Sequence, residues 1–582
     1  MARKARGNSA YVVVSLFIFF GLLYNRCIYH AAVTYYAVPF SGVAQHRTTK
    51  SAADFTANKL ITENFGLGDG GAAPGRRVIS TAPAIPAVAV AVPDWEVFVV
   101  ASPEYSPLNL DEDDPYMCLF EQGESSPAIP VGVLPFPDRS LFKCESPRSA
   151  RRRKVNKQPI LTLSSSLINF TFPPENSQPS LLQWNFLAYD SITTEDDVVL
   201  FVKGVNNRQG INRNPTELRC VFFHGDETIN AVKTAVTSSI QEVFRCKLPE
   251  FPAGKKQLIK VSLEIVGPNP IIVPTVAFYN PPLHLPEPET EPGTEPGNKK
   301  SKLCAATMVY NVAKNLKEWV MYHSQIGVER FILYDNNSDD ELRQTVKNLV
   351  QQQGIDVTTY FWPWPKTQEA GFSHSTVYAN SSCSWTIFTD VDEFLYSKSW
   401  DDFHEPSQSL LRSVLPETGD VAQLSVACLE FGPSNRTSHP PAGVTQGYNC
   451  RRKKENRHKS VVLLDAVDFS LVNVIHHFKL KPGFKTVKVK LEDMAVNHYK
   501  YQAWPEFKAK FRRRVSAYVI DWTRQENPNS NDRTPGLGYR PVEPEGWAMR
   551  FCEVYDEGLK LLTRRWFGVE SPAGLRLAWE SR

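Results

Sequence analysis

Residues 385–396 have the sequence Trp-Thr-Ile-Phe-Thr-Asp-Val-Asp-Glu-Phe-Leu-Tyr, and this stretch decides how we interpret the chain. Its first half is rich in β-branched and aromatic residues, as in a strand that is covered on both faces. Asp390, Asp392 and Glu393 follow where that strand is expected to end. Buried carboxylates are costly unless something compensates them, and at the C-terminal edge of an α/β sheet a ligand or a cation often does so.

The spacing of the two aspartates favours a metal site. Asp390 and Asp392 are two residues apart, so in a straight strand their side chains would point the same way. Mg²⁺ and Mn²⁺ are usually held by such oxygen ligands, with a substrate diphosphate filling other positions. A bare Asp-x-Asp is short and is more often an acidic turn. The hydrophobic run before it and the context described below reverse that preference.

Size and composition limit the choice of function. A chain of 582 residues is too long for one core, so two or three domains are expected. The formal charge of +3 gives no argument for a nucleic-acid partner, and we predict none. The chain has ten cysteines but no Cys-x-x-Cys pair, which argues against a zinc cluster.

The N-terminus resembles a membrane anchor. Three basic residues precede an apolar run at 10–24, which places the N-terminus in the cytosol. The run is short enough for a signal peptide, but no small-x-small cleavage site follows it. We therefore favour a cytosolic tail at 1–9 and an uncleaved signal anchor at 10–30, with the rest of the chain in the lumen of the secretory pathway. This single-pass, type II arrangement would allow disulfides to form.

Three segments follow the anchor. Residues 31–92 are rich in small and polar residues and are expected to form a stem. Residues 93–280 contain short β-rich runs separated by turn residues, which predicts an all-β, sandwich-like domain. Such a domain could bind carbohydrate through exposed aromatic residues, although core packing is the commoner role. The candidates are Trp95, Trp184 and Tyr189. A proline- and glutamate-rich linker at 281–299 is the clearest domain boundary.

Some cysteines fall on neighbouring predicted strands or flank the same loop. These could form disulfides, although the sequence leaves the connectivity open. The candidate pairs are Cys118 with Cys144, Cys220 with Cys246, and Cys428 with Cys450.

After the linker the pattern becomes α/β. The spacing of apolar residues predicts alternating strands and helices, with Gly327 and Gly354 closing the two helices. The predicted elements are strand 303–310, helix 311–326, strand 331–334, helix 342–353 and strand 357–362. This order is typical of the first half of a doubly wound nucleotide-binding sheet. Further along, aromatic residues of an amphipathic helix that begins at Trp504 are expected in the core, and Lys510 lies among its basic residues.

Polar residues collect at the predicted strand ends of this sheet. Any one of them is more often a turn residue or a helix cap, but their common location above one sheet edge favours a site. They include Asn311, Asp335, Asn336, Gln368 and Glu369.

Three segments together resemble a known family. They are 304–319 (CAATMVYNVAKNLKEW), 323–338 (HSQIGVERFILYDNNS) and 389–394 (TDVDEF). In this order they look like glycosyltransferase family 92, over about residues 300–560. The β-rich region is similar to the N-terminal module of the plant branch, which includes the galactan β-1,4-galactosyltransferases (galactan synthases).

The resemblance implies a fold, a donor and a location. Residues 300–582 would form a GT-A, Rossmann-like domain that uses a UDP-sugar and Mn²⁺, inverts the anomeric carbon and resides in the Golgi membrane. The expected reaction moves galactose from UDP-galactose to β-1,4-galactan side chains of pectin. A transferase for another UDP-sugar, such as UDP-arabinopyranose, and a non-catalytic scaffold protein that binds polysaccharide remain alternatives, and a homodimer is left open. A metal-dependent phosphohydrolase does not fit, since Phe394 stands two residues after Asp392.

The resemblance also suggests roles for single residues. The metal would be held by Asp392 and by His498, which matches the late histidine of GT-A chains but could equally be a satisfied core histidine. Asp390 would be a further metal ligand or face the ribose, and Lys500 would face phosphate. The uridine would lie near Tyr310, Asn311, Asp335 and Gln368.

The base is less well defined by the sequence. It must be a carboxylate, or less commonly a histidine, within hydrogen-bond reach of the acceptor hydroxyl. Glu430, after a strand-like run, is the first choice and Asp493 the second, although a capping or surface carboxylate is the commoner role for each. The basic run 451–459 predicts either a solvated loop or a contact with diphosphate or an acidic acceptor.

Overall fold

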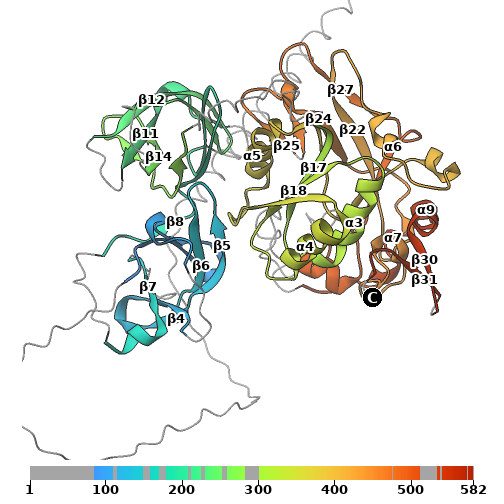
Figure 1. Ribbon diagram of the computed structural model, residues 1–582, viewed down its shortest axis with the longest axis horizontal. Helices are drawn as coiled ribbons and strands as arrows, with labels where there is room; N and C mark the ends of the chain where they lie inside the picture. The colour runs from blue at the N-terminus through green and yellow to red at the C-terminus, as the bar shows by residue number, and fades with distance from the viewer. Residues whose placement is uncertain are drawn as a thin grey trace, which may run out of the picture. The chain divides into compact units, whose positions relative to one another are not determined.

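The computed structural model describes most of the chain after residue 83 (Figure 1). The described ranges are 84–108, 114–147, 157–169, 178–206, 211–224, 230–251, 258–281, 300–474, 476–510, 534–537, 541–572 and 574–580. The predicted tail, anchor, most of the stem and nearly all of the linker lie outside them. Within these ranges, no helix combines the length and the apolar character that a membrane crossing requires.

The first β-rich part contains a five-stranded and a three-stranded sheet. The strand order is β5-β6-β2-β1-β8 in the larger sheet and β4-β3-β7 in the smaller. The strands are β1 (Ala87–Ala91), β2 (Glu96–Ala101), β3 (Tyr116–Leu119), β4 (Ser125–Pro127), β5 (Ile129–Leu134), β6 (Arg139–Glu145), β7 (Ile160–Leu163) and β8 (Leu182–Gln183). The predicted disulfide between Cys118 and Cys144 is confirmed and joins the two sheets.

The second β-rich part is a separate eight-stranded sheet. Seven strands follow the order β15-β14-β11-β12-β13-β10-β9, and β16 pairs with β14. They are β9 (Leu187–Thr193), β10 (Asp197–Lys203), β11 (Leu218–His224), β12 (Val232–Ile240), β13 (Val243–Lys247), β14 (Ile259–Ile265), β15 (Ile271–Ile272) and β16 (Phe278–Tyr279). The disulfide between Cys220 and Cys246 is also confirmed. The stretch that we expected to form one sandwich thus contains two sets of sheets.

The parallel half of the α/β sheet follows the prediction closely. The order β19-β18-β17-β20 is parallel throughout. The elements are β17 (Ser301–Val309), α3 (Ala313–Gln325), β18 (Arg330–Asp335), α4 (Leu342–Gln353), β19 (Asp356–Phe361), α5 (Gln368–Asn380) and β20 (Cys383–Phe388). Gly354 ends α4 in the left-handed conformation, with φ of 66°, as a C-terminal glycine should.

The other half of this sheet is mixed. β24 (His458–Leu463) pairs antiparallel with β20 and with β22 (Val421–Glu430), and β27 (Lys485–Lys488) pairs with β22. β28 (Ala495–His498) runs parallel to β22 and antiparallel to β21 (Glu393–Tyr396). In this register His498 lies between Glu393 on one neighbouring strand and Glu430 on the other.

Short elements complete the C-terminal part of the fold. They are the 3-10 turn at Lys398–Asp402, α6 (Ser409–Arg412), α7 (Val444–Gly447), β23 (Cys450–Arg451), β25 (Asn473–Val474), β26 (His477–Phe478), β29 (Val554–Tyr555), α9 (Gly558–Phe567), β30 (Gly568–Ser571) and β31 (Gly574–Leu577). Residues 504–510 are helical, and the predicted core role of their aromatic residues is confirmed for Trp504 and Phe507, which are buried.

The β-rich parts share an aromatic core with the α/β domain. Trp184 stacks on Trp364 with ring centroids 5.6 Å apart, and Tyr189 contacts Trp362 and Trp364. Trp364 donates its indole proton to Asp190. Trp184 and Tyr189 are therefore not available to a carbohydrate, whereas Trp95 is 57% exposed.

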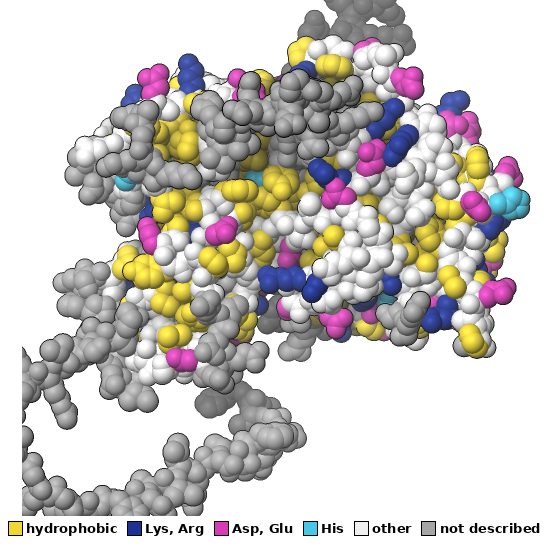
Figure 2. Space-filling view, in the orientation of Figure 1, with side chains coloured by type: hydrophobic (Ala, Val, Ile, Leu, Met, Phe, Trp, Pro, Cys, Tyr) yellow, Lys and Arg dark blue, Asp and Glu magenta, His cyan; other side chains and the backbone are white. Residues whose placement is uncertain are grey.

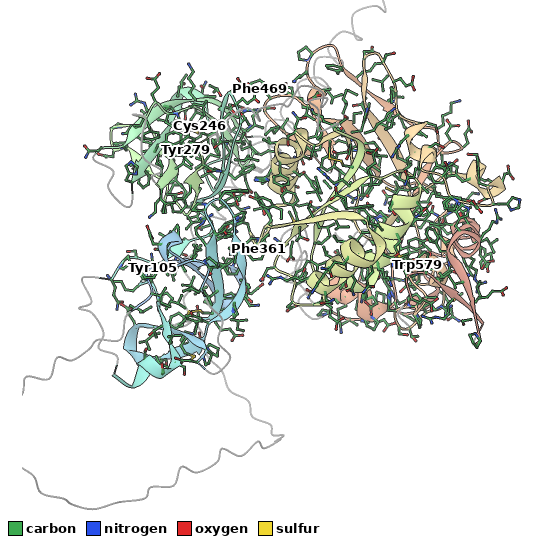
Figure 3. All side chains as sticks on the ribbon, in the orientation of Figure 1. Tyr105, Cys246, Tyr279, Phe361, Phe469 and Trp579 are labelled. Carbon is green, nitrogen blue, oxygen red and sulfur yellow. A yellow bond between two sulfur atoms is a disulfide. The ribbon has the colours of Figure 1, made fainter. Side chains whose placement is uncertain are left out.

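A second contact between these parts involves the edge of the α/β sheet. Gly132 of β5 lies so close to the ring of Phe361 that a Cβ atom there would stand 2.7 Å from it; Phe361 is labelled in Figure 3. Arg343 donates to the carbonyl of Val131. On the face shown in Figure 2, charges of both signs are interspersed among the described residues, in keeping with the formal charge of +3.

Two disulfides lie within the α/β domain. Cys304 bonds to Cys383 and so joins β17 to β20. Cys450 bonds to Cys552, so the predicted pair of Cys428 and Cys450 is wrong. Cys428 is a free, buried thiol because its side chain lies within the sheet on β22, where the protein core surrounds it.

Candidate functional site

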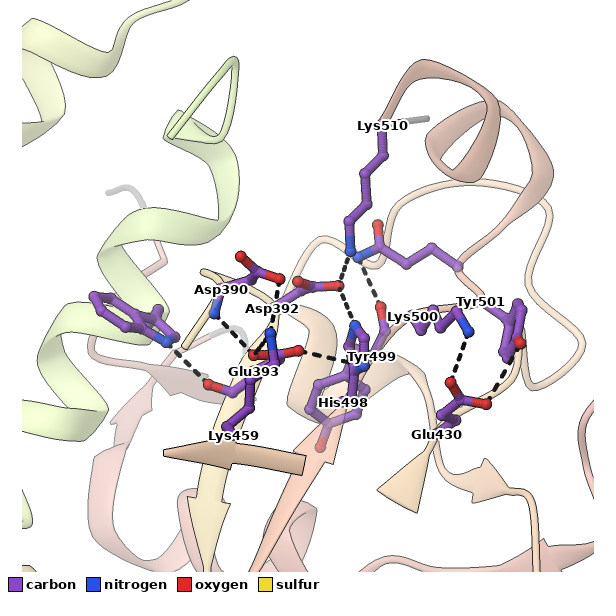
Figure 4. Close-up of polar contacts among 12 residues, drawn as sticks. Asp390, Asp392, Glu393, Glu430, Lys459, His498, Tyr499, Lys500, Tyr501 and Lys510 are labelled. Atoms are coloured by element: carbon purple, nitrogen blue, oxygen red, sulfur yellow. Dashed lines mark hydrogen bonds and ion pairs between the residues drawn. The ribbon is translucent and has the colours of Figure 1, made fainter. Parts of the chain in front are cut away.

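The acidic stretch forms a turn rather than the end of a straight strand. β20 ends at Phe388 and β21 begins at Glu393, so Asp390 and Asp392 lie between two strands. The turn is closed in both directions: the Glu393 N–H donates to the Asp390 carbonyl at 3.0 Å, and the Asp390 N–H donates to Glu393 Oε2 at 2.8 Å. The two aspartates consequently have different partners, contrary to the expectation from strand alternation (Figure 4).

Asp392 faces His498. Asp392 Oδ2 lies 3.6 Å from His498 Nε2, and the same oxygen forms an ion pair with Lys510 of the 504–510 helix. Asp392 is 4% exposed. Burial lowers the pKa of His498 well below its usual value, and Lys510 and Lys459 lower it further. The imidazole is therefore neutral at pH 7, as a metal-ligating histidine must be.

Asp390 belongs to a second, buried group of charges. Lys459 Nζ lies 3.1 Å from Asp390 Oδ2, 2.8 Å from Glu393 Oε2 and 2.8 Å from His476 Nε2. Burial raises the pKa of Glu393 to about 7, against the opposing effect of Lys459. Burial alone would lower the pKa of Lys459, but Asp390 and Glu393 outweigh it and raise that pKa. Asp390 thus pairs with Lys459, whereas Asp392 pairs with Lys510 and also faces His498. The role of Asp390 as a metal ligand or a ribose contact stays a prediction.

Glu430 is enclosed by cations on the other side of His498. Its Oε1 accepts from Lys500 at 2.6 Å, and its Oε2 accepts from Arg452 at 3.2 Å and from the Tyr501 hydroxyl at 3.4 Å. Glu430 is fully buried. A base needs a lone pair directed at the acceptor hydroxyl, so Glu430 could serve only if Arg452 or Lys500 moved. Its assignment as the base stays a prediction.

Asp493 is not part of this site. It lies on an exposed turn that precedes β28, whereas His498 ends that strand. The strand alone separates its first residue, Ala495, from His498 by about 10 Å. We therefore withdraw Asp493 as a candidate base.

The residues predicted to lie near the nucleotide meet at one sheet edge. Val309 and Phe361 both pair with Asp335, so the C-terminal ends of β17, β18 and β19 are level. Tyr310 and Asn311 follow β17 directly. Asn311 accepts from the Asp339 N–H at 2.9 Å, which ties the loops after β17 and β18 together.

Two further predicted residues lie at the same edge. Burial raises the pKa of Asp335, although its carboxylate accepts a hydrogen bond from the Ser338 N–H at 2.9 Å. Gln368 is the first residue of α5 rather than part of a loop. The structure thus gathers this set of residues, as parallel strands require, and their contact with a nucleotide stays a prediction.

The arrangement of Asp392 and His498 fits a divalent cation. A carboxylate oxygen and a neutral imidazole nitrogen face each other, and Lys510 already places a positive charge on Asp392. The described residues contain no cluster of three or more His, Cys, Asp or Glu side chains in metal-binding geometry. Mg²⁺-like cations are commonly bound by one or two protein ligands with substrate phosphates and water, so two ligands suffice.

Three residues of this site were not predicted from the sequence to be site residues. Glu393 was noted only as part of the acidic stretch. Lys459 belongs to the basic run 451–459, where Lys453 and Lys454 are exposed, as a solvated loop predicts, but Lys459 is only 6% exposed. The available signal was its place directly before the apolar run of β24, where four consecutive residues are buried. Lys510 had no signal beyond its place in a basic helix.

Known proteins were found that resemble the chain in sequence. Residues 299–534 match the model of glycosyltransferase family 92. A glycosyltransferase family 92 protein of Oryza sativa subsp. japonica is 39% identical over 501 residues, covering 82% of this chain and 80% of the relative. One from Arabidopsis thaliana is 40% identical, covering 65% of this chain and 66% of the relative, and one from Ricinus communis is 37% identical, covering 81% of each.

Solved structures resemble the chain only distantly. A mannosyltransferase from Pyrobaculum calidifontis in complex with GDP-Man and Mn²⁺ is 10% identical, with a TM-score of 0.24, over 40% of this chain and 66% of that one. Glucosyl-3-phosphoglycerate synthase from Mycobacterium tuberculosis, with Mn²⁺ and UDP, is 11% identical, with a TM-score of 0.17, over 29% and 58%. Such scores support no conclusion about this chain.

Proposed function

Because the chain belongs to glycosyltransferase family 92, we propose that it is an inverting hexosyltransferase of the GT-A type. The proposed reaction transfers galactose from UDP-galactose to β-1,4-galactan side chains of pectin. One observation carries the proposal: Nε2 of His498 and the buried carboxylate of Asp392 face each other at 3.6 Å, as two ligands of a cation that holds the donor's diphosphate would do.

The charges around this pair support the same proposal. Asp392 and His498 would hold Mn²⁺, which would neutralise the charge that develops on the leaving diphosphate. Lys500 follows β28 and Arg452 follows β23, and both contact Glu430, which ends the neighbouring strand β22. Their positive charges favour a phosphate group beside the metal. An acceptor hydroxyl must lose a proton as it attacks, and Glu430 is retained as its predicted acceptor.

The proposed location is the Golgi lumen, with the chain anchored by residues 10–30. Four disulfides among the described residues support an oxidising compartment, because such bonds rarely persist in the cytosol. Immunolocalisation against Golgi markers, with protease protection of the catalytic domain in sealed vesicles, tests the location. A catalytic domain digested without detergent would contradict it.

The proposed activity is tested with the purified full-length protein, galactan oligomers, Mn²⁺ and a panel of UDP-sugars, by measuring UDP release. We expect turnover with UDP-galactose, and we expect Asp392→Asn to lower it by roughly 100-fold or more, because a charged interaction with the developing transition state is removed. Asp420→Asn, which changes an exposed aspartate, is the matched control.

The outcomes separate the alternatives. Turnover with UDP-arabinopyranose but not UDP-galactose would change the donor. No turnover with any donor would favour the polysaccharide-binding scaffold. Full activity of Asp392→Asn would contradict the metal assignment.

A further inference from the structure

We propose that Glu393 is a positioning residue for this metal site. Its carboxylate holds the proton of His498 on Nδ1, so that the lone pair of Nε2 points toward Asp392 and the cation. The inference rests on the proposed function in one respect, namely that a divalent cation binds between Asp392 and His498.

The geometry places Glu393 on the correct side of the ring. Glu393 and His498 are direct cross-strand partners in β21 and β28. Glu393 Oε1 lies 3.3 Å from His498 Nδ1, while Nε2 on the other side of the same ring faces Asp392 Oδ2 (Figure 4). The imidazole is thus placed between two carboxylates that approach different nitrogens.

The two sides of the ring differ in what they can form. A neutral imidazole carries one proton, and a carboxylate facing Nδ1 attracts it to that nitrogen. The 3.6 Å between Nε2 and Asp392 Oδ2 is too long for a direct hydrogen bond. It is slightly more than the roughly 3 Å that separates neighbouring ligands of one cation with bonds of about 2.1 Å at right angles. Glu393 Oε1 is a buried oxygen that has no hydrogen-bond partner among the described residues, and it faces Nδ1 at 3.3 Å. A proton on Nδ1 would supply that partner and leave Nε2 to accept toward a cation.

Glu393 is fixed well enough to orient a neighbour. Its side chain is fully buried, its Oε2 accepts from the Asp390 N–H at 2.8 Å, and Lys459 Nζ lies 2.8 Å from the same oxygen. The carbonyl of Glu393 accepts from the indole of Trp319 at 2.9 Å. One carboxylate oxygen is thus anchored, and the other is left to face the histidine.

The opposite neighbour cannot replace it. Glu430 is also a direct cross-strand partner of His498, but its oxygens contact Lys500, Arg452 and Tyr501. A carboxylate that orients a metal-bound histidine usually affects metal affinity 10- to 100-fold when it is changed. Glu393 fits that role among the described residues around His498.

The test measures Mn²⁺ affinity of the full-length protein by calorimetry, without nucleotide or acceptor. We expect Glu393→Gln to weaken Mn²⁺ binding about 10- to 100-fold. Glu318→Gln is the matched control, because Glu318 is an equally buried carboxylate that contacts Thr445 and the backbone of Val444. In a His498→Ala background, Glu393→Gln should cost no further affinity, since Glu393 acts through His498.

A second measurement does not depend on metal. In metal-free protein with ¹⁵N-labelled histidine, we expect the His498 signals, assigned with His498→Ala, to show the proton on Nδ1. Wild-type protein with the proton on Nε2 would overturn the inference. So would unchanged Mn²⁺ affinity of folded Glu393→Gln. If wild-type protein bound no Mn²⁺, the proposed metal dependence would fail. The position of the His498 proton would still show whether Glu393 holds it on Nδ1.

A folding defect would not leave the question open. If Glu393→Gln does not fold, the double variant Glu393→Leu with Lys459→Met removes the ion pair between these two residues and keeps the volume filled, and Lys459→Met alone is the control for the partner that Asp390 loses. We expect the same loss of Mn²⁺ affinity from it. Wild-type affinity in this double variant would overturn the inference.

Discussion

Two buried carboxylates flank His498, and they differ in the cations around them. On the Glu393 side, the described residues bring three carboxylates, Asp390, Asp392 and Glu393, together with the two ammonium groups of Lys459 and Lys510. On the Glu430 side, one carboxylate meets two cations, Lys500 and Arg452. With every carboxylate counted as ionised, one side therefore has an excess of one negative charge and the other an excess of one positive charge.

This difference teaches how one short strand could present the proposed metal and the proposed diphosphate to each other. β28 presents His498 between the two groups, so a cation that binds on the acidic side lies beside the basic side. Neither group alone would suit a metal–diphosphate complex. The acidic side, with one negative charge in excess, would suit the metal cation. The basic side, with one positive charge in excess, would suit the diphosphate.

The largest expected effect comes from removing the internal cation of the acidic side. Lys459→Met leaves Asp390 and Glu393 buried without their shared partner, and breaking such a buried pair costs about 3 to 5 kcal/mol of unfolding free energy. Urea unfolding of metal-free protein measures this loss. Lys453→Met, in the exposed part of the same loop, should change stability by less than about 0.5 kcal/mol. A small effect of Lys459→Met would mean that the acidic side does not depend on this lysine.

A buried carboxylate whose hydrogen bonds, among the described residues, come from an uncharged segment sharpens the comparison. Glu318 is buried and accepts hydrogen bonds from the N–H groups of Val444 and Thr445 and from the Thr445 hydroxyl. Burial raises its pKa to about 7, despite these bonds. Because the folded protein then holds the Glu318 proton more tightly than the unfolded chain does, stability contributed by this group is present at low pH and is lost as the pH rises from about 4.5 toward 7.

The size of this pH effect follows from the shift. A rise from 4.5 to about 7 corresponds to roughly 3 kcal/mol. We expect Glu318→Gln to remove that part of the pH dependence when unfolding free energy is measured at pH 5 and pH 7. An unchanged slope between these pH values would show that Glu318 ionises normally.

The smallest expected effect is a difference between UDP affinity and Mn²⁺ affinity when the basic side alone is changed. Lys500→Met should weaken UDP binding about 10-fold, as expected for the loss of one charge-assisted contact, and leave Mn²⁺ affinity nearly unchanged. Calorimetry with each ligand measures the split, and Lys488→Met, which changes a lysine that is mostly exposed, is the comparison variant. Equal losses for UDP and Mn²⁺ would break the division into an acidic and a basic side.

The sequence predicted the parallel half of the sheet because its helices have a clear apolar face. α3 and α4 begin and end close to the predicted positions, and Gly354 marks one end. α5 was missed for the opposite reason: residues on all its sides are buried, so the sequence has no polar face from which a helical period could be recognised.

The site was predicted in part. Asp392 and His498 come together although more than 100 residues separate them, and the family resemblance rather than local pattern suggested that pairing. Sequence could not show that 389–392 form a turn, because alternation predicts side-chain direction only within a continuous strand. Nor could it show which charges pair: Lys459 and Lys453 belong to the same basic run, yet only Lys459 is buried.

The aromatic contact between Trp184 and Trp364 has a practical consequence for anyone who wishes to shorten the protein. The proline-rich linker suggests a truncation before residue 300. That truncation would remove residues that pack on Trp362 and Trp364, both of which have no exposed surface in the intact chain. Such a fragment would expose these hydrophobic indole rings to solvent, and we expect it to aggregate. Recombinant work on this catalytic domain should therefore retain everything from residue 84 onward.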